Sequence, residues 1–366
     1  MSEREPEPKT QPEWLEVLLL ALRLGFTAFG GPAAHIAMLR EEVVTRRGWQ
    51  SEARFLDLLG LTNLIPGPNS TEMVMHIGLE RAGWRGLLAA GFGFILPAAG
   101  ITLVLAVAYK EFASSPQLTG ILYGLKPVVI AVVAQAIWGL GRVVFKSWTS
   151  ALVALLAVFA SLFGGPELPI LFAGAALIVL LEQIRKTPNL NALEPVTLAG
   201  LFWLFLKIGG TIYGSGYVLL AFLRGEFVAR GWITPSQLLD AVSIGQVTPG
   251  PVFSSATFVG YLIAGYPGAI LATLAIFGPA FVFVAISGPF VAKVRNYPTS
   301  GLFLNGLNAA ALGLMLAVTL ELTRAALIDA WTLVLAFASA MALVRFKINS
   351  TWLVLAGATI GLILKH

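Results

Sequence analysis

The chain has 366 residues, of which 57% are hydrophobic and only 12% are charged, and its mean hydropathy is +0.83. A water-soluble globular protein carries about 25% charged residues, so this composition predicts an all-α, polytopic membrane protein. Its apolar runs are too long for the strands of a membrane β-barrel. The absence of cysteine excludes disulfides and cysteine-ligated metal sites. The net charge of +5 is spread over loops, which argues against a nucleic-acid partner.

The first half of the chain is predicted to contain helices interrupted by glycine and proline. A polar tail of residues 1–13 precedes a helix that starts at Trp14 and ends at the glycine pair Gly30 and Gly31. We expect no removable signal peptide, because no small-residue cleavage site follows the first apolar run. Further helices are expected over residues 85–109, 118–141, 148–163 and 168–182, and a polar linker over residues 185–195.

The most informative stretch runs from Asn63 to Thr71, inside an apolar run of residues 55–77. Pro66-Gly67-Pro68 cannot continue an α-helix, because proline lacks a backbone donor and clashes with the preceding turn. Asn69, Ser70 and Thr71 follow, and such side chains cap helix N-termini. A half-helix that starts at membrane depth presents free N–H groups and the positive end of its dipole, which is an arrangement that binds anions.

The second half of the chain repeats the first, which predicts two homologous repeats over residues 14–184 and 196–366. The repeated residues include Arg23 and Lys207, Glu42 and Glu226, Pro66-Gly67-Pro68 and Pro249-Gly250-Pro251, and Pro97 and Pro279, at offsets of 182–184 residues. So many ordered matches indicate an internal duplication. Paired broken helices at corresponding positions are the sequence sign of a transport site.

The distribution of positive charge favours an inverted second repeat. Lysine and arginine gather in one set of alternate loops in the first half and in the other set in the second half. Positive loops should lie on the cytoplasmic face, and inversion of the second copy removes the conflict. The loop of residues 40–54 argues against inversion, although its three glutamates blur the count.

Arg23 and Lys207 are the most specific single residues, because each is a cation within an apolar helix. An intramembrane cation faces a partner or a water-filled cavity. Two cations at matching positions would suit a dianion, with one positive charge from each repeat. The alternative is that each cation pairs with a structural carboxylate or reaches the interface.

Polar residues and glycines at the four breaks complete the predicted substrate site. Gly30, Gly31 and Gly214 serve either as hinges or as part of an anion cradle. Asn63 and Gln246 match across the repeat and would either bridge broken backbone or touch substrate. The candidate substrate-binding residues are Arg23, Gly30, Gly31, Asn63, Pro66, Gly67, Pro68, Asn69, Ser70, Thr71, Lys207, Gly214, Gln246, Pro249, Gly250 and Pro251.

The candidate proton carriers are His35, His76, Glu72, Glu42 and Glu226. His35 can titrate near neutral pH, although a histidine bonded within its loop is the simpler interpretation. Glu72 lies in the first turn of the half-helix, where capping is the simpler role. Asp57 and Asp240 are expected to stabilise helix starts, and Lys126 is a weaker site candidate. The sequence has no Walker A loop, no His-Glu-x-x-His and no Ser-His-Asp set, so we expect neither an enzyme, nor a cofactor, nor a metal site.

Several motifs together resemble the chromate ion transporter family, in its long-chain form with two domains. In the first half they are Phe29-Gly30-Gly31-Pro32, Arg47-Gly48-Trp49, Pro66-Gly67-Pro68-Asn69-Ser70-Thr71, Arg81-Ala82-Gly83 and Pro97. In the second half they are Tyr213-Gly214-Ser215-Gly216-Tyr217, Arg230-Gly231-Trp232 and Thr248-Pro249-Gly250-Pro251. Tyr213 stands where the family pattern has phenylalanine.

The resemblance implies antiparallel homologous halves and efflux of chromate across the prokaryotic plasma membrane, driven by the proton-motive force. Sulfate is the natural competitor, because it is also a tetrahedral dianion. The expected partners are therefore an oxyanion, protons, the lipid bilayer and a second copy of the chain in a homodimer. The alternatives are a carrier or channel for sulfate or another anion and, from a different class, a non-transporting membrane scaffold subunit.

Overall fold

The computed structural model describes residues 12–29, 31–62, 65–112, 115–144, 148–162, 170–171, 173, 197–213, 218–287, 298–346, 348 and 350–365. Within these ranges every regular element is a helix, which confirms the predicted all-α fold class. The predicted linker and nearly all of the predicted polar tail lie outside the described residues.

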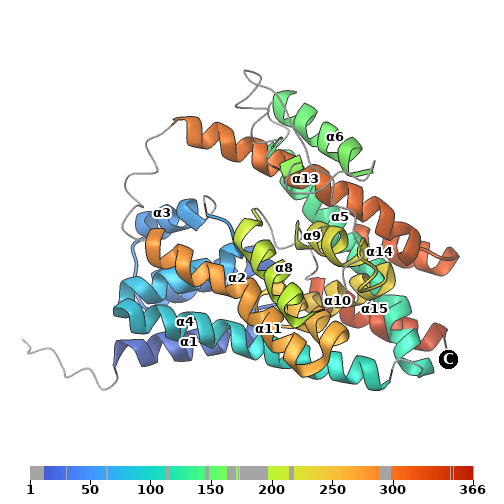
Figure 1. Ribbon diagram of the computed structural model, residues 1–366, viewed down its shortest axis with the longest axis horizontal. Coiled ribbons are helices and arrows are strands. Elements are labelled where there is room, and N and C mark those ends of the chain that lie inside the picture. Colours follow the sequence, from blue (N-terminus) through green and yellow to red (C-terminus); the bar gives the residue numbers. More distant parts are fainter. Residues whose placement is uncertain are drawn as a thin grey trace, which may run out of the picture.

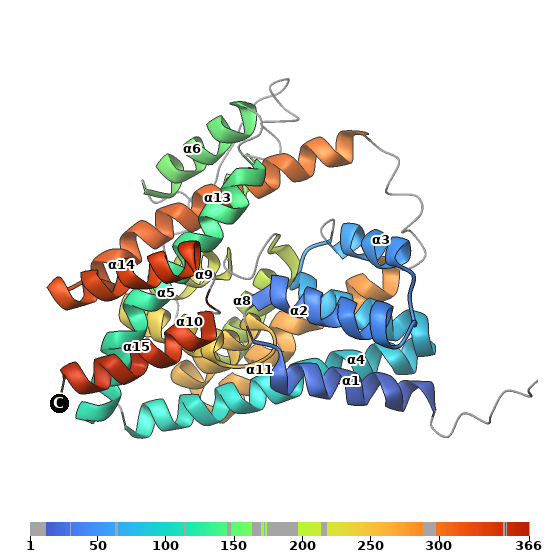
Figure 2. The same ribbon diagram turned by 180° about the vertical axis from the view of Figure 1, so that it is seen from behind.

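The described elements follow the two predicted repeats. In the first half they are α1 (Glu13–Thr27), α2 (Gly31–Arg40), η1 (Glu41–Arg46), α3 (Glu52–Thr62), α4 (Asn69–Glu111), α5 (Pro116–Val144) and α6 (Trp148–Leu162). In the second half they are α8 (Leu198–Thr211), α9 (Leu219–Leu223), η3 (Arg224–Val228), α10 (Pro235–Val247), η4 (Val252–Ser254), α11 (Ser255–Ser287), α13 (Pro298–Ala326), α14 (Ala330–Arg345) and α15 (Ser350–Leu364). Helix α1 lies along α4 and α8 lies along α11, whereas α5 packs with α13, α14 and α15 (Figures 1 and 2).

Helix α4 is a hairpin rather than one straight helix. Ala82 and Gly83 have non-helical dihedral angles, with a φ of 58° at Gly83. A Cβ atom on Gly78 would lie 2.3 Å from the carbonyl oxygen of Gly86, although residues eight apart in a straight helix are separated by about 12 Å. The chain therefore folds back, with a short arm of residues 69–81 and a long arm of residues 84–111. The short arm is about 20 Å long, too short to cross a hydrocarbon core of about 30 Å.

Helix α11 repeats this hairpin. Ala264 and Gly265 have φ angles of −139° and 61°, close to the −140° and 58° of Ala82 and Gly83. Thr257 and Thr273 share a hydrogen bond of 2.8 Å across the two arms. Its short arm covers residues 255–263 and its long arm covers residues 266–287. The duplication read from the sequence is thus a duplication of backbone geometry.

The contacts between the hairpins show that their short arms are inverted. Thr102 on the long arm of α4 donates to Ser254, 3.1 Å away, and the rings of Tyr109 and Phe258 lie 5.1 Å apart further along. Residue numbers rise together along this contact, so the short arm of α11 runs parallel to the long arm of α4. It therefore runs antiparallel to the short arm of α4. The predicted inversion is confirmed for these half-helices.

Glycines also bring α5 of the first repeat against α15 of the second. A Cβ atom on Gly124 would lie 1.9 Å from the carbonyl oxygen of Gly357, and one on Gly120 would lie 3.0 Å from that of Gly361. Within each helix the two glycines, Gly120 and Gly124 on α5 and Gly357 and Gly361 on α15, have the Gly-x-x-x-Gly spacing that lets membrane helices approach closely. The two repeats are therefore held together at the hairpins and again at α5 and α15.

By length and composition alone, four helical segments in the described part of the chain could cross a membrane: Asn69–Glu111, Pro116–Trp138, Val252–Ser287 and Ala309–Ala326. In the first and third of these, which are hairpins, the long arms are the segments of crossing length. Shorter apolar helices cover Ser150–Leu162, Leu198–Thr211, Ala330–Arg345 and Trp352–Leu364. Large apolar side chains face outward, with Trp84 65%, Phe337 72% and Trp352 69% exposed. Such a surface suits contact with lipid.

The hairpin of α4 yields a first prediction. In Gly86→Ala the new Cβ would lie 1.9 Å from the carbonyl oxygen of Gly78, so the arms must separate at a cost of about 1–3 kcal/mol or more. We expect a lower unfolding temperature in detergent. The control is Gly100→Ala on the same long arm, where no atom lies within 4 Å. Equal stability of the two variants would contradict the fold-back.

Candidate functional site

Each Pro-Gly-Pro break is joined in the interior to the other repeat by a backbone hydrogen bond. The N–H of Gly67 donates to the carbonyl of Ile212 at 2.8 Å, and the N–H of Gly250 donates to the carbonyl of Ala28 at 2.9 Å. Ala28 and Ile212 are matching residues of the two repeats, as are the two glycines. Each break is therefore bonded to the helix end of the other repeat. We call residues 66–68 and 249–251, with Ala28 and Ile212, the central crossing.

Glycine is required at both breaks. Gly67 and Gly250 have φ angles of 142° and 86°, in a region that side chains disfavour. A Cβ atom on Gly250 would lie 2.9 Å from the Cβ atom of Ala98. Ala98 is near the middle of the long arm of α4, so the central crossing lies near half the depth of that helix.

Two pairs of helix ends converge on the central crossing. Helices α1 and α8 end there, with Ala28 and Ile212 as extended C-caps. The short arm of α4 begins on its other side, after Pro68, and η4 begins after Pro251 and leads into the short arm of α11 at Ser255. The first N–H groups of a helix have no partner within the helix and carry the positive end of its dipole. Two such N-termini therefore face the crossing from opposite directions.

The predicted capping by Asn69, Ser70 and Thr71 is wrong. The N-cap residue of α4 is Pro68, and no side chain caps it. The Pro68 carbonyl accepts from the N–H of Thr71 at 2.8 Å and of Glu72 at 3.1 Å. The three polar residues lie inside the first turn, so their side chains do not occupy the capping position.

His35 joins the end of α1 to the start of α4. Its Nε2 lies 3.0 Å from the carbonyl oxygen of Ala28, and its Nδ1 lies 3.3 Å from Oγ of Ser70. A carbonyl only accepts, so Nε2 carries the hydrogen, and in the neutral ring Nδ1 accepts from the Ser70 hydroxyl. The histidine is bonded, as the simpler interpretation expected, but only Ala28 lies near it in sequence, and its other partner, Ser70, comes from α4. The Ser70 hydroxyl proton is thus committed to His35.

Glu72 and Thr71 are buried without polar partners. Both are 0% exposed, and neither the Glu72 carboxyl oxygens nor the Thr71 hydroxyl has a hydrogen-bond partner among the described residues. The predicted capping role of Glu72 is therefore wrong. The physical reason is that the N-cap residue is Pro68, which has no N–H for a carboxylate to accept from.

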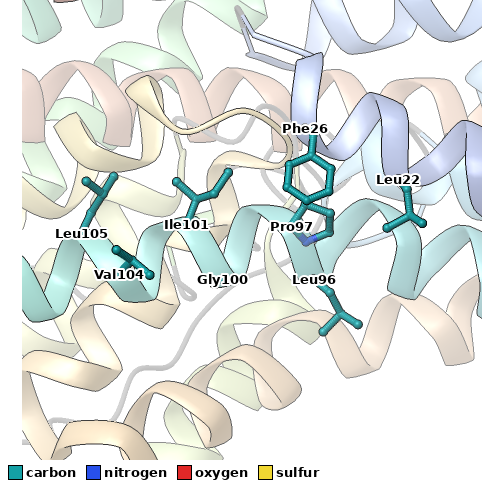
Figure 3. Close-up of a pocket in the computed structure, with 8 residues that line it drawn as sticks. All are labelled: Leu22, Phe26, Leu96, Pro97, Gly100, Ile101, Val104 and Leu105. Atoms are coloured by element: carbon teal, nitrogen blue, oxygen red, sulfur yellow. The ribbon is translucent and has the colours of Figure 1, made fainter.

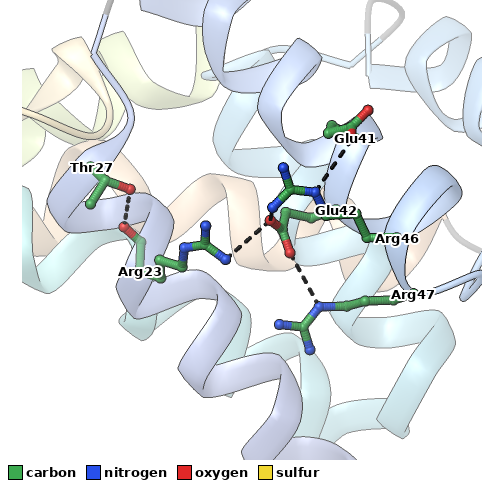
Figure 4. Close-up of polar contacts among 6 residues, drawn as sticks. All are labelled: Arg23, Thr27, Glu41, Glu42, Arg46 and Arg47. Atoms are coloured by element: carbon green, nitrogen blue, oxygen red, sulfur yellow. Dashed lines mark hydrogen bonds and ion pairs between the residues drawn. The ribbon is translucent and has the colours of Figure 1, made fainter.

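The intrahelical cations pair with buried carboxylates of their own repeat. Arg23 lies 3.1 Å from Glu42, which also holds Arg46 at 3.0 Å and Arg47 at 3.4 Å (Figure 4). Three guanidinium groups thus surround one carboxylate. Arg23 precedes Ala28 by five residues, or about 7.5 Å along the helix, and its side chain is 56% exposed.

Lys207 repeats the arrangement in the second half. It lies 2.5 Å from Glu226, which Arg230 also approaches at 3.3 Å. The pairing of each cation with a structural carboxylate, the alternative read from the sequence, is what the structure shows. Glu42 and Glu226, two of the predicted proton carriers, are both engaged in these ion pairs.

Several predicted residues do not reach the central crossing or are not described. Gly31 starts α2 with a φ of 76°, which confirms a second break in the first repeat. Gln246 instead lines a separate cavity of about 10 Å³ with Val252 and Ser255, which is room for about one water. Asn63, Gly30 and Gly214 lie outside the described residues.

A larger cavity of about 520 Å³ lies on the outer side of α1 and α4 (Figure 3). Its lining is entirely apolar and consists of Leu22, Phe26, Leu96, Pro97, Gly100, Ile101, Val104 and Leu105. A groove without polar groups cannot replace the hydration of an oxyanion. This groove is therefore a lipid-facing surface and not the anion site.

Sequence reasoning missed a buried charge cluster between the repeats. Asp240 is 1% exposed, accepts from the hydroxyl of Tyr109 at 2.9 Å and lies 3.2 Å from Lys126. It lies in the middle of α10, so the predicted role at a helix start is wrong. The signal was an acid flanked on both sides by apolar residues, which indicates a buried, paired carboxylate.

The chain was compared with known proteins. It matches the family model described as Chromate transporter twice, over residues 15–180 and 199–362. It is 28% identical over 370 residues to a chromate transport protein of Cupriavidus metallidurans, covering 95% of this chain and 92% of that one. It is 31% identical to the chromate transport protein of Pseudomonas aeruginosa, covering 88% and 83%, and 30% identical to a probable chromate transport protein of Synechococcus elongatus, covering 84% of each. No solved structure matches.

The central crossing yields a second prediction. Gly250→Ala adds an overlap with Ala98 to the strain of a positive φ, so we expect at least tenfold slower anion transport. Gly231→Ala is the matched control, because Gly231 has a φ of 72° but no atom within 4 Å of its Cβ position. It should cost about 1–2 kcal/mol in stability and leave transport intact. Transport rates in liposomes at equal protein content test this, and normal transport by Gly250→Ala would count against the crossing.

Proposed function

Because the chain belongs to the chromate transporter family, we propose that it is a secondary active transporter that carries chromate across the prokaryotic plasma membrane. The family resemblance predicted from the motifs is thereby confirmed. The relatives are named as transport proteins, and we propose no catalytic reaction for this chain. Efflux of chromate, powered by the proton-motive force, is the direction proposed from the sequence.

The observation that carries this proposal is the pair of reciprocal hydrogen bonds at the central crossing, Gly67 to Ile212 and Gly250 to Ala28. They join the start of each of the two inverted half-helices to a helix end of the other repeat, between the repeats. Half-helix N-termini at mid-depth between inverted repeats are where secondary transporters bind anionic groups. We assign the oxyanion to this point.

In the proposed site the oxyanion is bound by hydrogen-bond donors that are not already used within the protein. The first N–H groups after Pro68 and Pro251 donate to the oxyanion, and the buried hydroxyl of Thr71 adds a donor from the side chain. The Ser70 hydroxyl does not contribute its proton, because it donates to His35. Charge-assisted hydrogen bonds of this kind are roughly twice as strong as neutral ones.

Arg23 and Lys207 supply the surrounding positive potential. Each is tied to a carboxylate, but further arginines share that carboxylate, so the groups around Glu42 carry a surplus of positive charge. A dianion at the crossing is attracted by this surplus without touching the cations. Rocking of one hairpin against the other gives alternating access.

Two alternatives remain to be separated by experiment. A carrier or channel for sulfate or another oxyanion would use the same crossing, since the half-helices recognise tetrahedral shape and charge rather than the central atom. A scaffold subunit has no need of the paired half-helices. Protons and a second copy of the chain in a homodimer stay predicted partners.

The direct test is uptake of radiolabelled chromate into proteoliposomes. We expect uptake by the wild-type protein that responds to an imposed pH gradient and is inhibited by excess sulfate. Uptake that ignores the gradient would indicate a channel or exchanger. Purified protein that moves neither chromate nor sulfate would contradict the proposed function and favour the scaffold.

The cations are tested by Arg23→Gln and Lys207→Gln. In each variant an arginine still pairs with the carboxylate, so the fold should persist, whereas the lost charge should weaken chromate affinity by about tenfold, or about 1.4 kcal/mol. Arg40→Gln is the control, because Arg40 pairs with Glu52 on the exposed surface, where solvent screens such a pair and its loss has little effect. Normal chromate affinity in both variants would show that Arg23 and Lys207 do not contribute to anion binding.

A further inference from the structure

The geometry points to Glu72 as the single proton-binding group of the central crossing: the oxyanion binds there only when the Glu72 carboxyl is protonated, so that one proton and one anion travel together. This inference rests on the proposed function. It adds the identity of the proton site and the direction of coupling, which neither the family nor the fold assigns.

Glu72 lies directly against the Pro-Gly-Pro break. A Cβ atom on Gly67 would lie 2.2 Å from Oε1 of Glu72, so the carboxyl group rests on the backbone of the central crossing. The side chain is 0% exposed, and both oxygens lack a partner among the described residues. The carboxyl thus sits beside the helix N-terminus that we assign to the anion.

No cation neutralises this carboxyl within the described part of the chain. On the elements packed around it, Arg23 of α1 pairs with Glu42 and Arg54 of α3 pairs with Glu80. Helix α11 contains no charged residue, and Asp240 of α10 pairs with Lys126. A buried, ionised carboxylate without a partner is strongly unfavourable, so burial favours the neutral acid.

The neighbouring titratable groups are two histidines and one tyrosine. His35 of α2 is held by Ala28 and Ser70. His76, one turn after Glu72 on the same arm, lies 3.4 Å from the hydroxyl of Ser287, and its Nδ1 has no hydrogen-bond partner among the residues that the structure describes. Tyr213 follows Ile212, which accepts from Gly67. None of the three is bonded to the Glu72 carboxyl.

The two charge states of Glu72 have opposite effects on the anion. Ionised Glu72 would place a negative charge at the same positive helix end and repel a dianion. Protonated Glu72 removes that charge and offers an O–H donor to an oxyanion oxygen. Anion binding therefore favours protonation, and by linkage protonation favours anion binding to the same degree.

The coupling follows from this linkage. The matching residue of the second repeat is Ser255, whose hydroxyl donates to the Val252 carbonyl at 2.8 Å. The crossing thus has one such acid, and one proton accompanies each dianion.

The complex carries one net negative charge, so an interior-negative membrane potential drives it outward, whereas an inward proton gradient drives it inward. Export powered by the proton-motive force would draw on the potential.

The test compares the wild-type protein with Glu72→Gln, which imitates the protonated acid, in proteoliposomes with chromate. Because chromate itself takes up a proton in mildly acidic solution, the two proteins are compared at the same pH. We expect wild-type uptake to be accelerated about tenfold by an inward gradient of one pH unit, together with proton entry reported by a dye inside the vesicles. Glu72→Gln should exchange chromate at equal pH but show neither the acceleration nor the proton entry.

Glu52→Gln, an exposed change on α3, is the control and should behave as the wild type. Gradient-driven uptake with proton entry in Glu72→Gln would overturn the inference while leaving the proposed function intact. Chromate exchange at equal pH shows that the variant is folded. If exchange is absent, chromate binding to purified protein in detergent is followed with a pH indicator over a range of pH. Proton uptake on binding should rise from near zero, where Glu72 of the free protein is already protonated, to about one at higher pH, where it is ionised. No proton uptake at any pH would overturn the inference. A wild-type protein that neither binds nor moves chromate or sulfate would instead refute the proposed function.

Discussion

The structure depends on two hydrogen bonds that exchange backbone partners between the repeats, Gly67 to Ile212 and Gly250 to Ala28. In a bilayer every backbone polar group needs an internal partner, because lipid supplies none. A Pro-Gly-Pro break removes such partners from its own helix. Here each repeat supplies the carbonyl that accepts from the N–H at the other repeat's break, so neither break has this partner within its own repeat. The break is tolerated because it is shared.

This exchange sets the packing around it. For a backbone N–H of one repeat to reach a carbonyl of the other, the surrounding helices must lie close together. Small residues provide that proximity: a Cβ atom on Gly250 of the second repeat would lie 3.1 Å from the carbonyl oxygen of Gly25 and 2.9 Å from the Cβ atom of Ala98, both in the first repeat. Such contacts are how membrane helices associate, since lipid gives little hydrophobic driving force between them.

The features that depend on residue type and spacing could be predicted from the sequence, whereas those that depend on contacts formed on folding could not. Pro66-Gly67-Pro68 and its copy marked the breaks, and residue spacing marked the duplication. A break between residues 77 and 85 was expected, but the tight fold-back at Ala82 and Gly83, which packs Gly78 against Gly86, was not. The uncapped N-terminus at Pro68 and the unpartnered carboxyl of Glu72 were also missed. Whether a side chain finds a partner depends on distances that spacing does not contain.

The two repeats share their backbone geometry but differ in their polar side chains. The glycines at positions 67 and 250, and at 83 and 265, have matching roles and positive φ angles. The polar residues of the first short arm and of α2 do not recur: His35, Glu72 and His76 are matched by Leu219, Ser255 and Val259. A symmetric frame gives two related orientations of the hairpins, as alternating access requires. Under the proposed coupling, confinement of these titratable groups to one repeat would keep a single acid, Glu72, beside the anion in both orientations, so that no second acid on the other repeat would be needed.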